Sequence, residues 1–290
     1  MNVQAAINAG LFVQFVYNNW NIPSQTVDLT GRDVITPTGS PIIPGKNYKV
    51  LRTIYSNDLA TDIGPQRAIL EGYKTIGIVA SNEADSSDVF IALRGTEGIW
   101  EWLQDIKFFP RPFPNVSGSG LTEDGFTDMY RSFSLTPGPS STFLNDLKEA
   151  ISQNATVTIA GHSLGSALAT LLALDMAANS RLPITLYTLA SPRVGDLTFH
   201  NLFNHVVQSA YRIANRLDVV TQTPPPLFYF HVGDDTELVP PNTMKFTIPC
   251  EHALTTYLNM LATLIHQQSL YPIDNDCLKQ PPAPPAQTEV

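Results

Sequence analysis

The stretch VTIAGHSLGSALATLLALDMAA, residues 157–178, decides the fold of this chain. Its first four residues are an apolar run with β-branched members, which favours a strand buried on both faces. Its last fourteen residues are rich in alanine and leucine, the strongest helix formers. Between them lies Gly161-His-Ser-Leu-Gly165, a G-x-S-x-G pattern. A strand that turns directly into a helix at a serine is the setting in which this pattern marks a nucleophile elbow.

The two glycines give the pattern a physical reason. A turn at Ser163 requires a tight, strained backbone, and Gly161 and Gly165 leave room for neighbouring backbone where a side chain would clash. The turn displays the Ser163 hydroxyl at the end of the strand and places the helix N-terminus beneath it. The alternative, a serine that only caps a buried helix, is the weaker interpretation because both the strand and the helix flank the pattern.

The bulk composition excludes several classes of protein. With 290 residues, 43% hydrophobic residues and a net charge of −9, the chain is an ordinary globular protein and a poor partner for nucleic acid or anionic membranes. A neutral or weakly charged substrate fits better. Apolar runs stay well below the roughly 20 residues of a transmembrane segment. The first positive charge is Arg32, so we expect no secretory signal in the chain, and the protein is either cytoplasmic or secreted with its signal absent.

The chain is expected to form a single domain over residues 1–279, followed by a proline-rich tail at 280–290. Alternating strands and helices predict an α/β fold with a mostly parallel sheet and helices on both faces. Helices are expected at residues 5–16, 142–152, 165–178 and 251–267. Strands are expected at residues 48–55, 75–80, 89–93, 157–160, 184–189, 211–214, 228–232 and 244–248. The two cysteines, Cys250 and Cys277, permit one disulfide at most.

A serine hydroxyl needs a base that removes its proton, and in sheets of this kind the acid and then the histidine follow the serine in the chain. Asp218 is the best candidate for the acid because it lies just past the expected strand at 211–214. The other aspartates are ranked lower: Asp196 in a loop is second, Asp175 within the helix is a solvated or capping residue, and Asp234 and Asp235 belong to a turn.

His252 is the best candidate for the base. It is expected at the start of a helix, directly after a strand, where an imidazole at the carboxyl edge of the sheet can be aimed at the serine. His162 neighbours the serine and cannot bend back to it, and His200 and His205 precede the acid. His231 is expected inside an apolar strand as a structural histidine, and His266 late in a helix facing solvent.

The negative charge that develops on a substrate oxygen requires donors near the serine. The backbone N–H of Leu164, at the helix N-terminus, is one expected donor. Arg94-Gly95-Thr96 follows the strand at 89–93 and can supply the second through a backbone N–H, with the Thr96 hydroxyl as an additional donor. From these residues alone, an ordinary strand-ending turn is the favoured interpretation.

Taken in order, the motifs over roughly residues 70–260 resemble the class 3 lipases, the fungal-type triacylglycerol lipase family of the α/β-hydrolases. The residues that carry the resemblance are Phe90-Ile-Ala-Leu-Arg-Gly-Thr96, Trp102-Leu-Gln-Asp105, Gly125-Phe126, Gly161-His-Ser-Leu-Gly165, Ala190-Ser-Pro-Arg-Val-Gly195, Arg212-Ile-Ala-Asn-Arg-Leu-Asp218-Val-Val220, His231-Val-Gly233 and Cys250-Glu-His252. The resemblance implies an α/β-hydrolase fold with Ser163, Asp218 and His252 as nucleophile, acid and base. It also implies that Thr96 and Leu164 form the oxyanion hole and that Asp105 supports the threonine hydroxyl.

Two features depart from the family pattern. Val220 stands where the family often has a proline two residues after the acid. The secreted fungal members usually carry several disulfides, which two cysteines cannot reproduce. These differences point to a bacterial or intracellular type of member, or to one that is stapled differently.

The segment EGIWEWLQDIKFF, residues 97–109, follows the oxyanion threonine and has apolar residues at helical spacing. At this position the family carries a lid, an amphipathic helix that covers the active site and moves away at a lipid–water surface. The alternative is a core helix whose apolar stripe stays buried. The expected lid and substrate-binding residues are Ile99, Trp100, Trp102, Leu103, Ile106, Phe108 and Phe109.

We therefore expect a serine hydrolase that cleaves carboxylic esters of neutral lipids at a lipid–water interface through an acyl-enzyme, without a metal or organic cofactor. A short-chain esterase or a phospholipase A1 on the same frame is the close alternative. An inactive binding protein with this fold is the alternative from another class.

Overall fold

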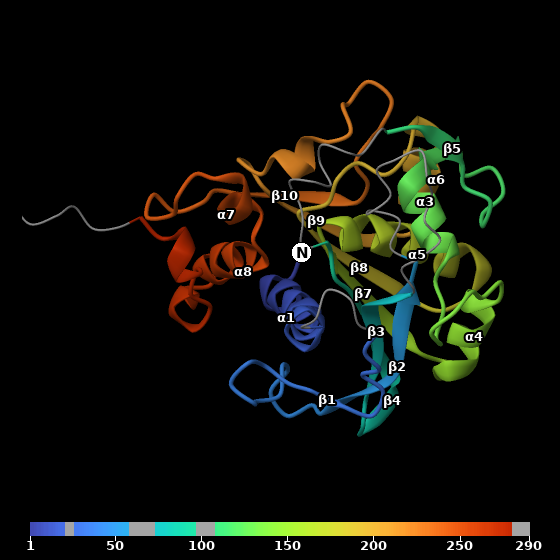
Figure 1. Ribbon diagram of the computed structural model, residues 1–290, viewed down its shortest axis with the longest axis horizontal. Coiled ribbons are helices and arrows are strands. Elements are labelled where there is room, and N and C mark those ends of the chain that lie inside the picture. The colour runs from blue at the N-terminus through green and yellow to red at the C-terminus, as the bar shows by residue number, and fades with distance from the viewer. Residues whose placement is uncertain (21–25, 58–72, 97–107, 280–290) are drawn as a thin grey trace, which may run out of the picture.

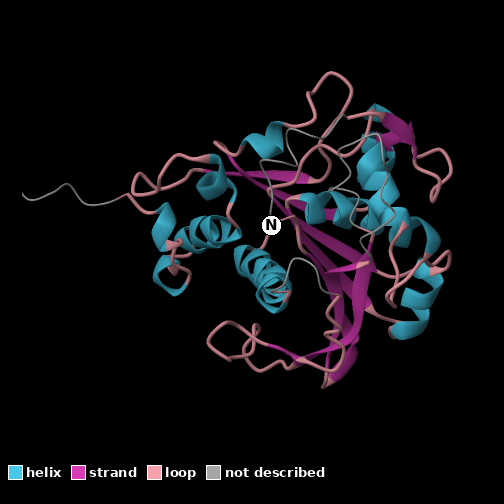
Figure 2. Ribbon diagram, viewed as in Figure 1, coloured by secondary structure: helices cyan, strands magenta, loops and turns pink. Residues whose placement is uncertain are grey.

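The computed structural model describes residues 1–20, 26–57, 73–96 and 108–279. Within these residues, an eight-stranded sheet runs through the centre and helices cover both of its faces (Figures 1 and 2). The strand order is β1-β2-β3-β4-β7-β8-β9-β10, and β5 and β6 form a separate two-stranded sheet. The strands are β1 Asp33–Val34, β2 Tyr48–Ser56, β3 Lys74–Asn82, β4 Asp85–Leu93, β5 Pro110–Pro112, β6 Leu121–Glu123, β7 Thr156–His162, β8 Ile184–Leu189, β9 Ser209–Asn215 and β10 Asp234–Leu238.

The half of the sheet that carries the elbow is parallel. Strands β4, β7, β8, β9 and β10 pair in parallel, whereas β1 to β4 pair as antiparallel neighbours. Leu93 lies opposite Gly161, and His162 lies opposite Leu189, so β4, β7 and β8 end at one edge of the sheet. The expected α/β architecture with a mostly parallel sheet is confirmed.

Two hydrophobic cores pack on the two faces of the sheet. On one face, α1 lies beside α8 (Figure 1), and Phe12 stacks on Phe90 of β4 with ring centroids 4.0 Å apart. On the other face, α5 packs on β7 and β8, and α3 and α6 pack on α5. The helices are α1 Val3–Asn19, α3 Asp124–Arg131, α4 Phe143–Ala150, α5 Leu164–Asn179, α6 Leu197–Val206, α7 Ile248–His252 and α8 Leu254–Thr263, with short 3₁₀ turns η2 Val219–Gln222, η3 Gln268–Leu270 and η4 Asn275–Cys277.

Two strands expected from the sequence are not strands in the structure. Residues 228–232 and 244–248 are irregular, and each contributes only an isolated bridge, at Phe230 and Met244. The last strand is instead β10, which begins with two aspartates that were expected in a turn. Because β10 is the edge of the sheet, four of its five side chains are exposed or only partly buried, and it lacks the apolar signature of a central strand.

The helix expected over residues 251–267 is broken. Ala253, with a ψ of 134°, separates α7 from α8, and α8 ends at Thr263. His252 is therefore the last residue of α7 rather than the first residue of a longer helix, and His266 lies in the exposed turns beyond α8.

The proline-rich tail at 280–290 lies outside the described residues, so the expected domain boundary at residue 279 stays a prediction. In the ranges that the structure describes, each helix is too short or too polar to cross a membrane.

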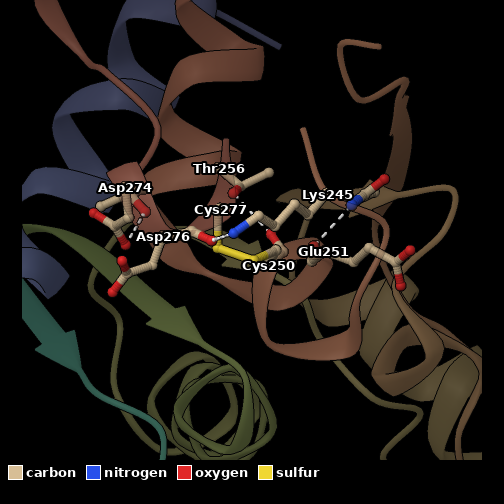
Figure 3. Close-up of a disulfide and its surroundings, with 9 residues drawn as sticks. Lys245, Cys250, Glu251, Thr256, Asp274, Asp276 and Cys277 are labelled. Carbon is tan, nitrogen blue, oxygen red and sulfur yellow. Dashed lines mark hydrogen bonds between the residues drawn. A yellow bond between two sulfur atoms is a disulfide. The ribbon is translucent and has the colours of Figure 1, made fainter. Parts of the chain in front are cut away.

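A disulfide joins Cys250 of α7 to Cys277 of η4 (Figure 3). The surrounding segments are also joined by hydrogen bonds: Lys245 Nζ donates to the Asp276 carbonyl at 2.7 Å, and Thr256 Oγ1 donates to the Cys250 carbonyl at 2.8 Å. The disulfide is buried, and it ties the short helix that ends in His252 to the C-terminal segment.

Replacing both cysteines by serine is expected to lower the free energy of unfolding by about 3 kcal/mol, because the crosslink closes a loop of 27 residues and restricts the unfolded chain. Urea denaturation of the double variant and of the wild type measures the difference. An unchanged midpoint and slope would contradict a stabilising role.

Candidate active site

The elbow at Ser163 has the strained geometry that the G-x-S-x-G pattern predicts. β7 ends at His162, α5 begins at Leu164, and Ser163 between them has φ 59° and ψ −131°. This left-handed conformation is unfavourable for a residue with a side chain. The Ser163 N–H donates to the Leu189 carbonyl at 2.9 Å, which anchors the turn to β8.

Gly161 and Gly165 allow backbones to touch directly. A Cβ built on Gly161 would lie 2.3 Å from the Gly165 oxygen, and one built on Gly165 would lie 2.4 Å from the Leu93 oxygen and 2.5 Å from the Arg94 oxygen. The first turn of α5 therefore packs against β7 and against the end of β4 with no side chain between. This contact brings the Arg94-Gly95-Thr96 loop beside the elbow.

Asp218 and His252 are joined by a hydrogen bond. Asp218 follows β9 at the start of η2, and its Oδ2 lies 2.8 Å from His252 Nδ1. Tyr257 of α8 donates its hydroxyl to the same oxygen at 2.8 Å, and the Val220 N–H donates to Oδ1 at 3.0 Å. The carboxylate is 1% exposed, so these three donors replace the water that a buried charge requires.

Tyr257 is a site residue that sequence reasoning missed. Burial and the Asp218 charge raise the pKa of its hydroxyl well above the ordinary value, so the group stays protonated and donates. Its own oxygen accepts the Asn215 N–H at 2.9 Å. The only signal in the sequence is a tyrosine within the apolar stripe after His252, and such a residue is indistinguishable from a core tyrosine.

Two polar atoms of the site have no hydrogen-bond partner in the part of the chain that the structure describes. Ser163 Oγ and His252 Nε2 are buried, and neither has a hydrogen-bond partner among the described residues. Because Nδ1 of His252 faces a carboxylate, the neutral imidazole carries its proton on Nδ1 and leaves Nε2 as a bare acceptor. The site therefore holds an unengaged hydroxyl and an unengaged imidazole nitrogen. His252 is tied to the elbow through its carbonyl, which lies 2.9 Å from His162 Nε2.

The loop after β4 lies against the nucleophile. A Cβ built on Gly95 would come within 2.7 Å of the Ser163 Cβ, and Thr96 follows as a half-buried residue. Leu164 is the first residue of α5, so its N–H is one of the helix N-terminal donors without an acceptor within the helix. Leu164 thus directly follows Ser163, and Thr96 directly follows the glycine that lies against Ser163.

The remaining aspartates have structural partners. Asp175 was expected to be solvated or capping, but it is 2% exposed and accepts hydrogen bonds from Asn115 and Tyr130. Asn179, one turn further along α5, also donates to Asp175 at 2.7 Å. These donors make the burial of the carboxylate acceptable, and the two from outside α5 could not be inferred from the sequence around it. Asp196 caps α6 through its bond to the Phe199 N–H.

The other histidines lie away from Ser163 Oγ or turn their nitrogens elsewhere. His231 is not inside a strand as expected, although it is hydrogen-bonded: its Nε2 lies 2.9 Å from the Thr221 carbonyl. Burial and then the charges of Arg212 and Arg193 lower the pKa of His231 to about 3, so it stays neutral. His162 Nε2 lies 2.9 Å from the carbonyl of His252.

The expected lid lies largely outside the described residues. This applies to Asp105, Ile99, Trp100, Trp102, Leu103 and Ile106. Of the two remaining residues, Phe108 is partly buried and its carbonyl accepts the Tyr229 hydroxyl at 2.8 Å, whereas Phe109 is 62% exposed. Over the described ranges, no cluster of three or more His, Cys, Asp or Glu residues is arranged to hold a metal ion.

Comparison with known proteins matches residues 90–228 to the model of the class 3 lipase family. The chain is 32% identical to a lipase of Rhizomucor miehei over 199 residues, covering 67% of this chain and 52% of the relative. It is 30% identical to the chloroplastic phospholipase A1-Ialpha2 of Arabidopsis thaliana over 274 residues, covering 74% of this chain and 54% of that protein. The chain spans about half the length of each of these relatives.

The solved structure of the Rhizomucor miehei lipase propeptide complex superposes with a TM-score of 0.59 at 24% identity, over 81% of this chain and 67% of the other. This likeness shows the shared α/β-hydrolase fold. The matched family segment contains the elbow, the loop after β4 and Asp218. Over residues 90–228, the chain belongs to the class 3 lipase family.

Proposed function

We propose that this protein hydrolyses carboxylic esters of neutral lipids through an acyl-enzyme, with Ser163 as nucleophile, His252 as base and Asp218 as acid. The observation that carries the proposal is the buried Asp218–His252 hydrogen bond beside Ser163, with His252 Nε2 and Ser163 Oγ both left open. A hydroxyl next to a base that a carboxylate orients is the arrangement required for nucleophilic catalysis.

In the acylation step, Ser163 Oγ attacks the ester carbonyl while His252 Nε2 takes its proton. Asp218 keeps the Nδ1–H of His252 in place and stabilises the imidazolium that forms. The carbonyl electrons move onto oxygen, and when the tetrahedral intermediate collapses, the bond to the alcohol breaks and His252 returns the proton to the departing oxygen. In deacylation His252 activates a water molecule, which releases the fatty acid and restores Ser163.

The oxyanion is held, in this proposal, by the backbone N–H groups of Leu164 and Thr96. Leu164 contributes the positive end of α5 as well as its own N–H. The Thr96 hydroxyl is the additional donor. The close approach of Gly95 to Ser163 supports this assignment, because Thr96 directly follows Gly95 in the chain.

Two substrate classes are suggested by the relatives, one named a lipase and the other a phospholipase A1. We favour neutral acylglycerols, because the net charge of −9 disfavours anionic lipid surfaces. Phospholipase A1 activity stays the second candidate because of the plant relative. The lid role of residues 97–109 is part of the same proposal.

A fluorophosphonate probe is expected to label the wild-type protein once, at Ser163, and to leave Ser163→Ala unlabelled. Ser166→Ala is the matched control, because Ser166 lies on the same turn and its hydroxyl only donates to the Leu189 carbonyl. Mass spectrometry of the labelled protein gives the site and the stoichiometry. Labelling that survived in Ser163→Ala would overturn the nucleophile assignment.

Thr96→Ala is expected to lower kcat by on the order of 100-fold if the hydroxyl helps to hold the oxyanion. Thr96→Ser retains the hydroxyl and is expected to keep most of the activity. Steady-state hydrolysis of p-nitrophenyl butyrate measures both variants. Equal rates for Thr96→Ala and the wild type would restrict Thr96 to its backbone N–H.

Hydrolysis of a triacylglycerol is expected to rise steeply where the substrate passes from dissolved monomers to an emulsion, because a lid opens at the interface. The rate on the emulsion is expected to exceed that on phosphatidylcholine vesicles of the same acyl chain, measured as fatty acid released at constant pH. A smooth saturation curve would indicate a plain esterase. Faster cleavage of phosphatidylcholine at the sn-1 position would indicate a phospholipase A1.

A further inference from the structure

The C-terminal end of α1 makes a continuous set of polar contacts behind Ser163. The Gly95 N–H donates to the Tyr17 hydroxyl at 2.7 Å, and that hydroxyl lies 3.0 Å from His162 Nδ1. On the other side of the ring, His162 Nε2 lies 2.9 Å from the carbonyl oxygen of His252. A tyrosine of the first helix thus connects the loop after β4, the elbow and the backbone of the proposed base.

The donors and acceptors of these groups fix where each proton lies in this series of hydrogen bonds. The His252 carbonyl can only accept, so His162 carries its proton on Nε2. Burial and then the neighbouring His252 lower the pKa of His162 well below its ordinary value, so the ring is neutral and Nδ1 is a bare acceptor. Tyr17 therefore donates its O–H to His162 Nδ1 while its oxygen accepts from Gly95. Each contact has one donor and one acceptor.

The carbonyl of Gly95 is held from the opposite side. Arg94 Nη1 donates to the Gly95 oxygen at 2.7 Å, and Arg94 Nε donates to the Thr75 carbonyl at 2.8 Å. The Arg94 guanidinium lies over the ring of Trp20, with Cζ 3.3 Å from the ring centroid. Trp20 is the C-cap residue that follows α1. The end of this helix therefore contacts the Gly95 N–H directly, through Tyr17, and the Gly95 carbonyl indirectly, through Trp20 and Arg94.

The Gly95 carbonyl and the Thr96 N–H belong to the same peptide plane. Whatever fixes the direction of the Gly95 oxygen also fixes the direction of the Thr96 N–H, which points the opposite way. An oxyanion donor stabilises a transition state only when it is aimed before the charge develops. Arg94 holds this plane through the Gly95 carbonyl, and Tyr17 holds the preceding Arg94–Gly95 plane through the Gly95 N–H, so the two contacts together restrain the backbone that carries the Thr96 N–H.

We propose that Tyr17 and Trp20 are positioning residues: they orient the Gly95–Thr96 peptide as an oxyanion donor, and Tyr17 also steadies His252 through His162. This inference rests on the proposed function. It adds a role for the first helix, outside the segment that matches the family model, and for His162, which was excluded as a base.

Tyr17→Phe tests the inference because it keeps the ring and removes only the hydroxyl. The expected result with p-nitrophenyl butyrate is a fall in kcat of about 10-fold with KM unchanged, since oriented donors act in the transition state and not on the bound ester. The affinity for n-butylboronic acid, which forms a tetrahedral adduct on the serine, is expected to fall by a similar factor.

Tyr48→Phe is the matched control. Tyr48 is a buried tyrosine that packs edge-on against Phe12 of α1 with ring centroids 5.0 Å apart, and its hydroxyl donates to Asp88 at 2.6 Å. It is expected to lose stability through one hydrogen bond while kcat and boronate affinity stay at the wild-type values. All assays are run below the melting temperature of each variant.

Trp20→Leu is the second variant, and it tests the positioning role if Tyr17→Phe does not fold. It is expected to show the same signature, with lower kcat, unchanged KM and weaker boronate binding. Wild-type kcat in the folded variants, or equal losses in Tyr48→Phe, would overturn the positioning role. If the wild type itself neither hydrolyses esters nor reacts with the fluorophosphonate, the proposed function fails instead.

Discussion

The site depends on a contact between two backbones. Gly161 and Gly165 let the first turn of α5 press against β7 and against the carbonyls at the end of β4, so that Ser163, Leu164 and the Thr96 loop converge at one point. A Cβ at either glycine would lie 2.3–2.4 Å from a backbone oxygen, so the segments would have to move apart. The strained φ of Ser163 is the local consequence of this approach, and its bond to Leu189 keeps the conformation in place.

Around this point, each polar group is held by an element from a different part of the chain. Asp218 follows β9, and His252 ends α7. α8 brings Tyr257 to the carboxylate, and α1 brings Tyr17 to the loop after β4. Parallel strands make this convergence possible because their carboxyl ends lie at the same edge of the sheet. The disulfide at Cys250 secures α7, the shortest of the helices that carry a site residue, to the end of the described chain.

The elbow and its partners could be predicted because their patterns are local. A strand, a glycine-flanked serine and a helix occupy consecutive residues, and Asp218 follows a strand that is apolar in the sequence. The wrongly predicted strands lie where the position of a segment in the fold, and not its own residue pattern, determines its structure. β10 is polar because it is an edge strand. Met244, from the segment expected to be a strand at 244–248, packs in a small cluster with the disulfide rather than in the sheet.

Polar contacts between distant segments also could not be predicted from the sequence. Two of the donors to the buried Asp175, Tyr130 and Asn115, come from distant segments. Tyr17 and Tyr257 resemble ordinary apolar-stripe residues until the fold brings them to Gly95 and Asp218. Each of these pairs joins segments at least 39 residues apart. Local periodicity indicates which face of a helix is buried, but not which polar group of another segment that face will contact.

The most direct test of the central claim is a crystal structure of the adduct that an alkyl fluorophosphonate forms with the protein. We predict that phosphorus is bonded to Ser163 Oγ and that its phosphoryl oxygen lies about 2.7–3.1 Å from the backbone nitrogens of Leu164 and Thr96. His252 Nε2 is expected to face Oγ or the alkoxy oxygen of the adduct. A phosphoryl oxygen turned away from both nitrogens, or an adduct on another residue, would contradict the site described for this protein.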